Sequence, residues 1–138
     1  MDTAALARRV KDRGIEIGLG TIGIACVGPS DHAAFLSGWL ARGFAGEMGW
    51  MARTAEARLD PRRRFPWARA ALVAAVPYLP YQGDRHAQAG LVKHVARYAA
   101  GRDYHRVLGD RLSTLARFIE AEAPGARTRV DTDTGPVL

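Results

Sequence analysis

Hydrophobic residues recur at helical spacing in three segments of the chain, and each segment begins beside an aspartate that can cap a helix. The expected helices run from Thr3 to Arg13, from Asp31 to Arg42, and from Asp103 to the Pro124–Gly125 stop. Gly14 and Gly43 supply natural stops for the first two. The third is the most regular, because its apolar positions form one stripe, which consists of Tyr104, Val107, Leu108, Leu112, Leu115 and Ile119.

Three shorter segments have the pattern of β-strands. Ile22 to Cys26 alternates apolar and small residues and ends at the Gly28–Pro29 turn. Residues 70–76 form an uninterrupted apolar run, which predicts a central strand covered on both faces. Thr128 to Thr132 is expected to form another strand. Helices that alternate with strands predict the α/β class, with a layered sheet and flanking helices.

The rest of the chain lacks a clean period. Between Phe44 and Ala68, glycines and prolines predict a loop with one short helix from Thr54 to Leu59. Pro80 to Gly90 is also expected to be a loop. Pro136 and the apolar residues after it look like the first turn of a further helix. We therefore expect residues 1–138 to be an incomplete α/β domain.

The composition is that of a globular protein. The chain has 138 residues, of which 48% are hydrophobic, which is enough to bury a core. It contains no apolar stretch of about 18 residues and no signal-peptide pattern, so we expect a cytoplasmic protein without membrane association. Cys26 is the only cysteine, which excludes an internal disulfide and any multi-cysteine metal or iron–sulfur site formed by these residues alone.

The chain is strongly basic, with 20 Lys plus Arg against 14 Asp plus Glu and a net charge of +6. Guanidinium groups suit phosphate oxygens, and a domain with a pI above about 9 is a candidate for nucleic-acid contact. The densest cluster is Arg62, Arg63 and Arg64. A phosphate-binding role and a solvated turn before the next strand both remain open for it, and the arginine bias itself is also explained by a GC-rich coding background.

Other local motifs are weaker. Residues 18–23 have the Gly-x-Gly-x-x-Gly spacing of a dinucleotide-binding turn, but a strand follows where a helix is needed. The four histidines lack the paired spacing of zinc ligands, so no intrinsic metal site is expected. The group formed by Met48, Trp50 and Met51 fits either a ligand pocket or an ordinary core.

Five short strings, taken in order, resemble the successive landmarks of the epoxyqueuosine reductase family. The most telling are Gly-Arg-Asp-Tyr-His, ahead of the last helix, and Asp-Thr-Gly-Pro, after the last predicted strand. The resemblance spans nearly the whole chain, and the five strings are Gly46–Met51, Glu56–Pro61, Ala68–Val73, Arg97–His105 and Val130–Leu138.

The resemblance implies an oxidoreductase of queuosine biosynthesis. Members of the family remove the epoxide oxygen of epoxyqueuosine at the wobble position of tRNA, using cobalamin and two [4Fe–4S] clusters. A cysteine-rich C-terminal domain holds the clusters, and none of its ligands is present here. We therefore expect this chain to lack the iron–sulfur domain, to be inactive alone, and to belong to a monomeric protein whose substrate is tRNA.

The resemblance also implies roles for individual residues. Asp133 is the expected proton donor to the epoxide oxygen, in contact with the cofactor, and its alternative role is to cap the helix at Pro136. Arg58 is expected to border the corrin and donate to its amide carbonyls. Ala96 permits close approach of the macrocycle, and Tyr104 and His105 are assigned to the same pocket, although Tyr104 also fits the buried stripe.

Two other functions remain as alternatives. One is a non-catalytic RNA-binding module, which the basic charge and Arg62–Arg64 favour. The other is a cobalamin protein similar to reductive dehalogenases, which also use cobalamin and iron–sulfur clusters. The latter predicts a twin-arginine export signal, and the sequence has none.

Overall fold

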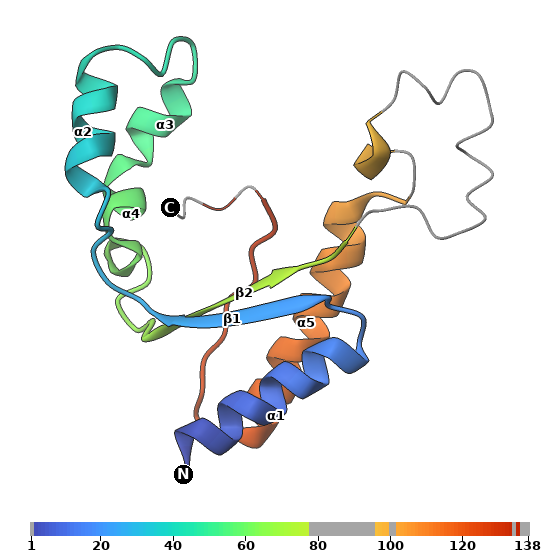
Figure 1. Cartoon of the computed structure of the whole chain (residues 1–138). Coiled ribbons are helices and arrows are strands. Elements are labelled where there is room, and N and C mark those ends of the chain that lie inside the picture. The colour runs from blue at the N-terminus through green and yellow to red at the C-terminus, as the bar shows by residue number, and fades with distance from the viewer. Residues whose placement is uncertain (1, 78–95, 100–101, 134, 136–138) are drawn as a thin grey trace, which may run out of the picture. The chain divides into compact units, whose positions relative to one another are not determined.

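The computed structural model describes residues 2–77, 96–99, 102–133 and 135 (Figure 1). The expected loop at Pro80–Gly90 and the helical turn at Pro136 lie outside these residues. The elements in order are α1 (Thr3–Glu16), β1 (Thr21–Cys26), α2 (Ala33–Ala41), α3 (Gly49–Arg53), α4 (Ala55–Leu59), the 3-10 turn η1 (Pro61–Arg63), β2 (Ala70–Ala75), the 3-10 turn η4 (Arg97–Ala99) and α5 (Tyr104–Glu122). None of the helices described is both long and apolar enough to cross a membrane.

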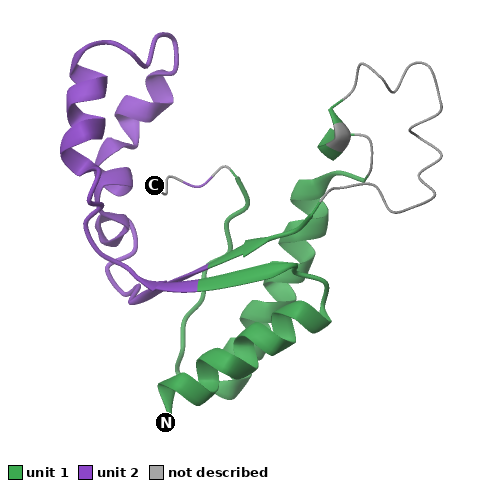
Figure 2. Cartoon of the chain, in the orientation of Figure 1, with its two compact units in different colours: residues 1–23, 73–133 green, residues 24–72, 134–138 purple. Residues whose placement is uncertain are grey.

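The chain divides into two compact units (Figure 2). Unit 1 consists of residues 1–23 and 73–133, and unit 2 consists of residues 24–72 and 134–138. The boundary passes through β1 and β2, which pair with each other. The pairing is antiparallel, because Gly20 N–H donates to the carbonyl of Ala75 while Val27 N–H donates to that of Arg69.

Unit 1 has its core where α1 and α5 pack together. An ion pair between Arg9 and Glu122 links the two helices, and Arg111 donates to the carbonyl of Gly18 at 2.8 Å. The buried apolar side chains of this unit come from α1, β1, α5 and the residues next to β1 and α5, and each of the two predicted helical stripes contributes one of them. They are Val10, Leu19, Ile22, Leu115 and Ala123.

The first helix begins as predicted but ends later. The Asp2 carboxylate accepts hydrogen bonds from the amides of Ala4 and Ala5 at 2.9 and 3.2 Å, which confirms the cap. The stop expected at Gly14 is wrong, because α1 continues to Glu16 and the chain reverses at Gly18, where φ is +88°. Gly14 has another role: it is buried, and a Cβ atom there would overlap the side chain of Ile22 in β1.

Unit 2 contains the short helices α2, α3 and α4, and Leu36 is its buried apolar residue in the part of the chain described. Helix α2 is shorter than predicted, and the Asp31 cap is wrong. His32 occupies the N-cap position and its amide donates to Ser30 Oγ at 3.1 Å, so a serine side chain satisfies this turn. The expected helix from Thr54 to Leu59 is confirmed as α4, whereas α3 forms where the sequence predicted only loop.

The α/β class is confirmed, but the layered sheet is not. The described residues form a single two-stranded sheet, in which β2 has only β1 as a neighbour and Val73 is 67% exposed. The expectation of a central strand covered on both faces is therefore wrong for this part of the chain. Thr128–Thr132 forms no strand either: Thr128 bonds through its amide and hydroxyl to Glu120 Oε1, at 3.2 and 2.5 Å, in place of a strand partner.

Candidate functional site

A hydrogen-bonded cluster in unit 1 joins the start of α5 to the segment that follows it in sequence. The phenol of Tyr104 donates to Asp133 Oδ2 at 2.6 Å, although the two residues are 29 positions apart. His105 Nε2 lies 3.6 Å from the same oxygen. Three of the residues that the family resemblance singled out are thus brought together.

The start of α5 fixes the direction of the two ring side chains. Asp103 is the N-cap, as predicted, and its Oδ1 accepts the backbone N–H of His105 at 3.0 Å. The same Oδ1 lies 3.0 Å from Nδ1 of the imidazole. The His105 ring stacks on the Tyr104 ring with centroids 4.1 Å apart. One carboxylate therefore orients both the helix and the histidine.

Asp133 lies in a strained backbone conformation. Its φ of +61° is in the left-handed region, where Asp and Asn are the non-glycine residues tolerated best. Its side chain is 61% exposed, so the described residues do not themselves provide the desolvation expected around a carboxylic acid that must stay protonated. The alternative role of Asp133, capping a helix at Pro136, stays a prediction because Pro136 lies outside the described residues.

Charge in the cluster favours a protonated phenol. The hydrogen bond to Asp133, followed by desolvation and the nearby carboxylates, raises the pKa of Tyr104 to about 12. Tyr104 is therefore a hydrogen-bond donor at every pH below that value. The hydrogen bonds from His105 lower the pKa of Asp103, so Asp103 stays ionised at neutral pH and the imidazole pairing is lost only as the pH falls through that lowered pKa.

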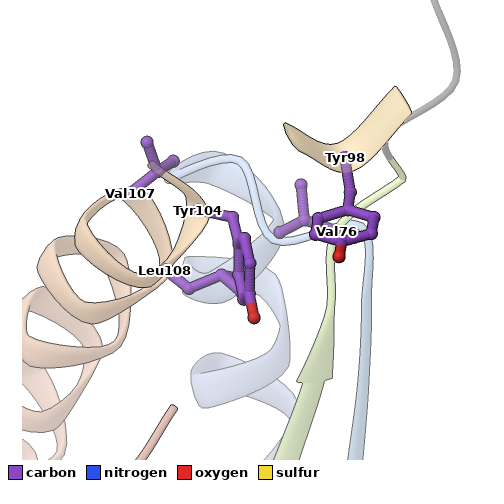
Figure 3. Close-up of a pocket in the computed structure, with 5 residues that line it drawn as sticks. All are labelled: Val76, Tyr98, Tyr104, Val107 and Leu108. Carbon is purple, nitrogen blue, oxygen red and sulfur yellow. The ribbon is translucent and has the colours of Figure 1, made fainter. Parts of the chain in front are cut away.

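A mainly apolar cavity of about 330 Å³ borders the cluster (Figure 3). The rings of Tyr98 and Tyr104 meet edge to face, with centroids 5.7 Å apart. Tyr104 thus contributes its ring to the cavity wall and its hydroxyl to Asp133, which places an apolar surface next to a proton-donating group. Among the described residues, the lining consists of Val76, Tyr98, Tyr104, Val107 and Leu108.

Sequence reasoning missed two contributors to this site. Asp103 was recognised as a helix cap but not as the partner of the imidazole. Its position two residues before a histidine at a helix N-terminus was the signal, because that spacing lets one carboxylate reach both groups. Tyr98 carried no signal of its own beyond lying in a matching string. Ala96, by contrast, was predicted, and it lies exposed just before η4.

Arg58 lies in unit 2, so its position is described separately from the cluster. Its Nε donates to Thr54 Oγ1 at 3.0 Å, and its guanidinium carbon lies 5.0 Å from the centroid of the Trp50 ring. The Gly-Trp-Met and Glu-x-Arg strings therefore form one local structure. Trp50 and Met48 are 46% and 40% exposed, so the interpretation of this group as ordinary core is wrong.

The three adjacent arginines differ in their surroundings. Arg62 forms a two-pronged pair with Asp60, at 2.9 and 2.7 Å, and these bonds lower the pKa of the Asp60 carboxyl. Arg64 lies over the Phe65 ring at 5.6 Å. Arg63 is exposed, and the described residues show no ion pair for it. Arg63 is therefore the member of the cluster best placed to meet an external phosphate.

The glycine-rich motif does not have the structure of a nucleotide-binding turn. The glycines of residues 18–23 connect α1 to β1, and β1 occupies the place where a dinucleotide-binding turn requires a helix. Among the residues described, no three histidine, cysteine or carboxylate side chains are grouped closely enough to hold a metal ion.

Comparison with known proteins identifies the family of the chain. A family model described as "Epoxyqueuosine reductase QueG, DUF1730" matches residues 58–134, which include the whole cluster. This chain belongs to the epoxyqueuosine reductase family. No solved structure matches it.

Named relatives match over almost the full chain. The epoxyqueuosine reductase of Gloeobacter violaceus is 43% identical over 97% of this chain, and that of Vibrio cholerae is 35% identical over all of it. The Escherichia coli enzyme is 33% identical, again over the whole chain. These matches cover 41%, 38% and 37% of the respective relatives, so the chain spans about two fifths of their length.

Proposed function

We propose that the protein to which these residues belong is an epoxyqueuosine reductase, which converts epoxyqueuosine to queuosine in tRNA in the cytoplasm. The observation that carries this proposal is the bond between Tyr104 and Asp133, because it joins the two strings on which the family resemblance depends most. Family membership favours this activity over organohalide reduction.

The reaction explains why such a cluster is needed. Removing an epoxide oxygen to leave an alkene consumes two electrons and two protons, and the oxygen leaves as water. The C–O bond opens more easily when an acid protonates the departing oxygen. In this proposal the Asp133 carboxylic acid supplies the first proton, and the Tyr104 hydroxyl fixes the orientation of the carboxyl group.

The cavity fits a cofactor only in part. A volume of about 330 Å³ is at the lower end for small-molecule sites and can take only an edge of a corrin. In our proposal the described residues therefore supply only part of the cofactor site. We assign Tyr104, which lines the cavity, and His105 and Ala96, which do not, to the border of the corrin, and we assign Arg58 to donation to corrin amides. When bound, reduced cobalamin supplies the electrons that open the epoxide, fed by two [4Fe–4S] clusters. The single cysteine of this chain cannot ligate those clusters.

The function is tested with protein expressed from the complete coding sequence in a bacterial strain that lacks epoxyqueuosine reductase. We expect nucleosides from digested tRNA to contain queuosine, and the purified protein to bind cobalamin in a spectroscopic titration. Persistence of epoxyqueuosine despite soluble expression would reject the activity. Queuosine formation without cobalamin binding would reject the cofactor assignment and keep the function.

A non-catalytic RNA-binding module is the second candidate, and the exposed Arg63 is the observation that favours it. If Arg63 contacts a tRNA phosphate, Arg63→Gln should reduce the slope of log affinity against log salt concentration by about 0.7 to 0.9. Arg62→Gln should change the slope less, because Asp60 already pairs with Arg62. Fluorescence anisotropy with labelled tRNA measures both slopes, and Lys11→Gln on the exposed side of α1 is the control.

The outcomes separate the candidates. If Arg63→Gln and the Lys11 control give equal slopes of log affinity against log salt concentration, Arg62–Arg64 form a solvated turn without a phosphate-binding role. A reduced slope together with absence of both cobalamin binding and queuosine formation would favour the binding module.

A further inference from the structure

His105 lies between two carboxylates. Its Nδ1 is 3.0 Å from Asp103 Oδ1, and its Nε2 is 3.6 Å from Asp133 Oδ2. The phenol ring of Tyr104 stacks on the imidazole. A histidine held at one nitrogen by a carboxylate and presenting the other to a reacting group is the arrangement by which proteins set a tautomer.

The role of Asp103 follows from its charge. An ionised carboxylate only accepts hydrogen bonds, so the nitrogen that faces Asp103 must carry a proton. In the neutral imidazole the proton is then on Nδ1, and Nε2 gains a proton only when the ring becomes positively charged. That second proton lies on the side of Asp133.

Tyr104 is poorly suited to replace a proton lost from Asp133. With its pKa raised to about 12, the phenol holds its proton at neutral pH and serves as a fixed donor. Histidine is the side chain whose ordinary pKa lies closest to neutral. The His105 side chain is 45% exposed, so solvent can reach it.

We propose that His105, oriented by Asp103, returns a proton to Asp133 after each reaction. This inference rests on the proposed function. Asp133 gives its proton to the epoxide oxygen and becomes a carboxylate. The imidazolium of His105 then transfers its Nε2 proton to Asp133 Oδ2 and becomes neutral, and water recharges the imidazole.

The geometry is tested first without any activity. In ¹⁵N-labelled chain, the two imidazole nitrogens of neutral His105 are distinguished by NMR. We expect Nδ1 to carry the proton in the native chain. Asp103→Ser keeps a good helix cap but is too short to hold the imidazole, so the tautomer preference should disappear while the helical circular dichroism is retained. A native chain with the proton on Nε2 would overturn the proposal.

The second test separates proton return from mere positioning. In active protein with saturating reductant, His105→Ala should lower the steady-state rate at least about tenfold more than the rate of the first turnover, because the first turnover does not require a proton returned through His105. Added imidazole should restore the steady-state rate. Arg106→Gln, an exposed neighbour in α5, is the control.

The outcomes distinguish this inference from the proposed function. If His105→Ala lowers the first-turnover rate and the steady-state rate equally, and imidazole restores neither, then His105 has a structural role and the proposal is overturned. Wild-type rates for His105→Ala would also overturn it. If the native protein does not convert epoxyqueuosine at all, the proposed function is rejected. Proton return to Asp133 is then rejected as well, even if NMR confirms the expected tautomer of His105.

Discussion

Asp133→Asn should lower the single-turnover rate of epoxyqueuosine reduction by about 10²-fold or more, the scale of general acid catalysis. Asparagine removes the transferable proton and changes little else. Its side-chain oxygen can still accept the hydrogen bond that Tyr104 donates at 2.6 Å. Asparagine also tolerates the left-handed backbone at φ +61°, where alanine would add strain. The reaction is followed by mass spectrometry of tRNA nucleosides.

Asp131→Asn provides a matched control for this change. Asp131 is a partly exposed carboxylate two residues earlier that lies 3.4 Å from Arg129 and outside the cluster. We expect it to react at the native rate. Near-native conversion by Asp133→Asn would reject the acid assignment. Loss of folding in that variant, measured by circular dichroism, would instead support a structural role such as a helix cap.

The helices of unit 1 were predictable because their signals are local. A capping aspartate and an apolar stripe specify α1 and α5 from residues within four positions of each other, and the structure confirms both. The end of α1 was misplaced for a nonlocal reason. Gly14 is glycine because β1 approaches closely, which no pattern within the helix reveals.

The sheet was less predictable because strand pairing depends on distant residues. The alanine-rich run of β2 has small apolar side chains that suit a buried strand, yet only β1 pairs with it in the described part of the chain. Thr128–Thr132 has residues that favour a strand, but the structure does not form a strand there. The residue types of these two segments favoured strands, but they could not show how many other strands each would pair with.

The candidate site was predicted through resemblance and could not be derived from spacing. Nothing local relates Tyr104 to Asp133 across 29 positions, and without the family strings Asp133 would have been taken as a cap. The structure adds two physical facts: the hydrogen bond that joins them and the contact of His105 with Asp103. The contact of His105 with Asp103 could have been predicted from the sequence, because an N-cap residue and a histidine two positions later are neighbours in the first helical turn.

The largest stability effect is expected for Leu115→Ala. Leu115 is 1% exposed in the middle of α5, and its removal should leave a cavity in the core of unit 1. We expect the free energy of unfolding to fall by about 2 to 5 kcal/mol, the range for buried leucines. Because α5 also carries Tyr104 and His105 in its first turn, loss of its packing should loosen the cluster as well.

Urea denaturation followed by circular dichroism measures this effect. Val73→Ala is the control, since Val73 is also apolar but 67% exposed, and its change should stay within about 0.5 kcal/mol. A loss below about 1 kcal/mol for Leu115→Ala would mean that α5 is not held to α1 by a packed core. A fall of the expected size in the free energy of unfolding, together with broadening of the His105 NMR signals, would show that the core of unit 1 keeps the imidazole and the Asp133 carboxylate in place.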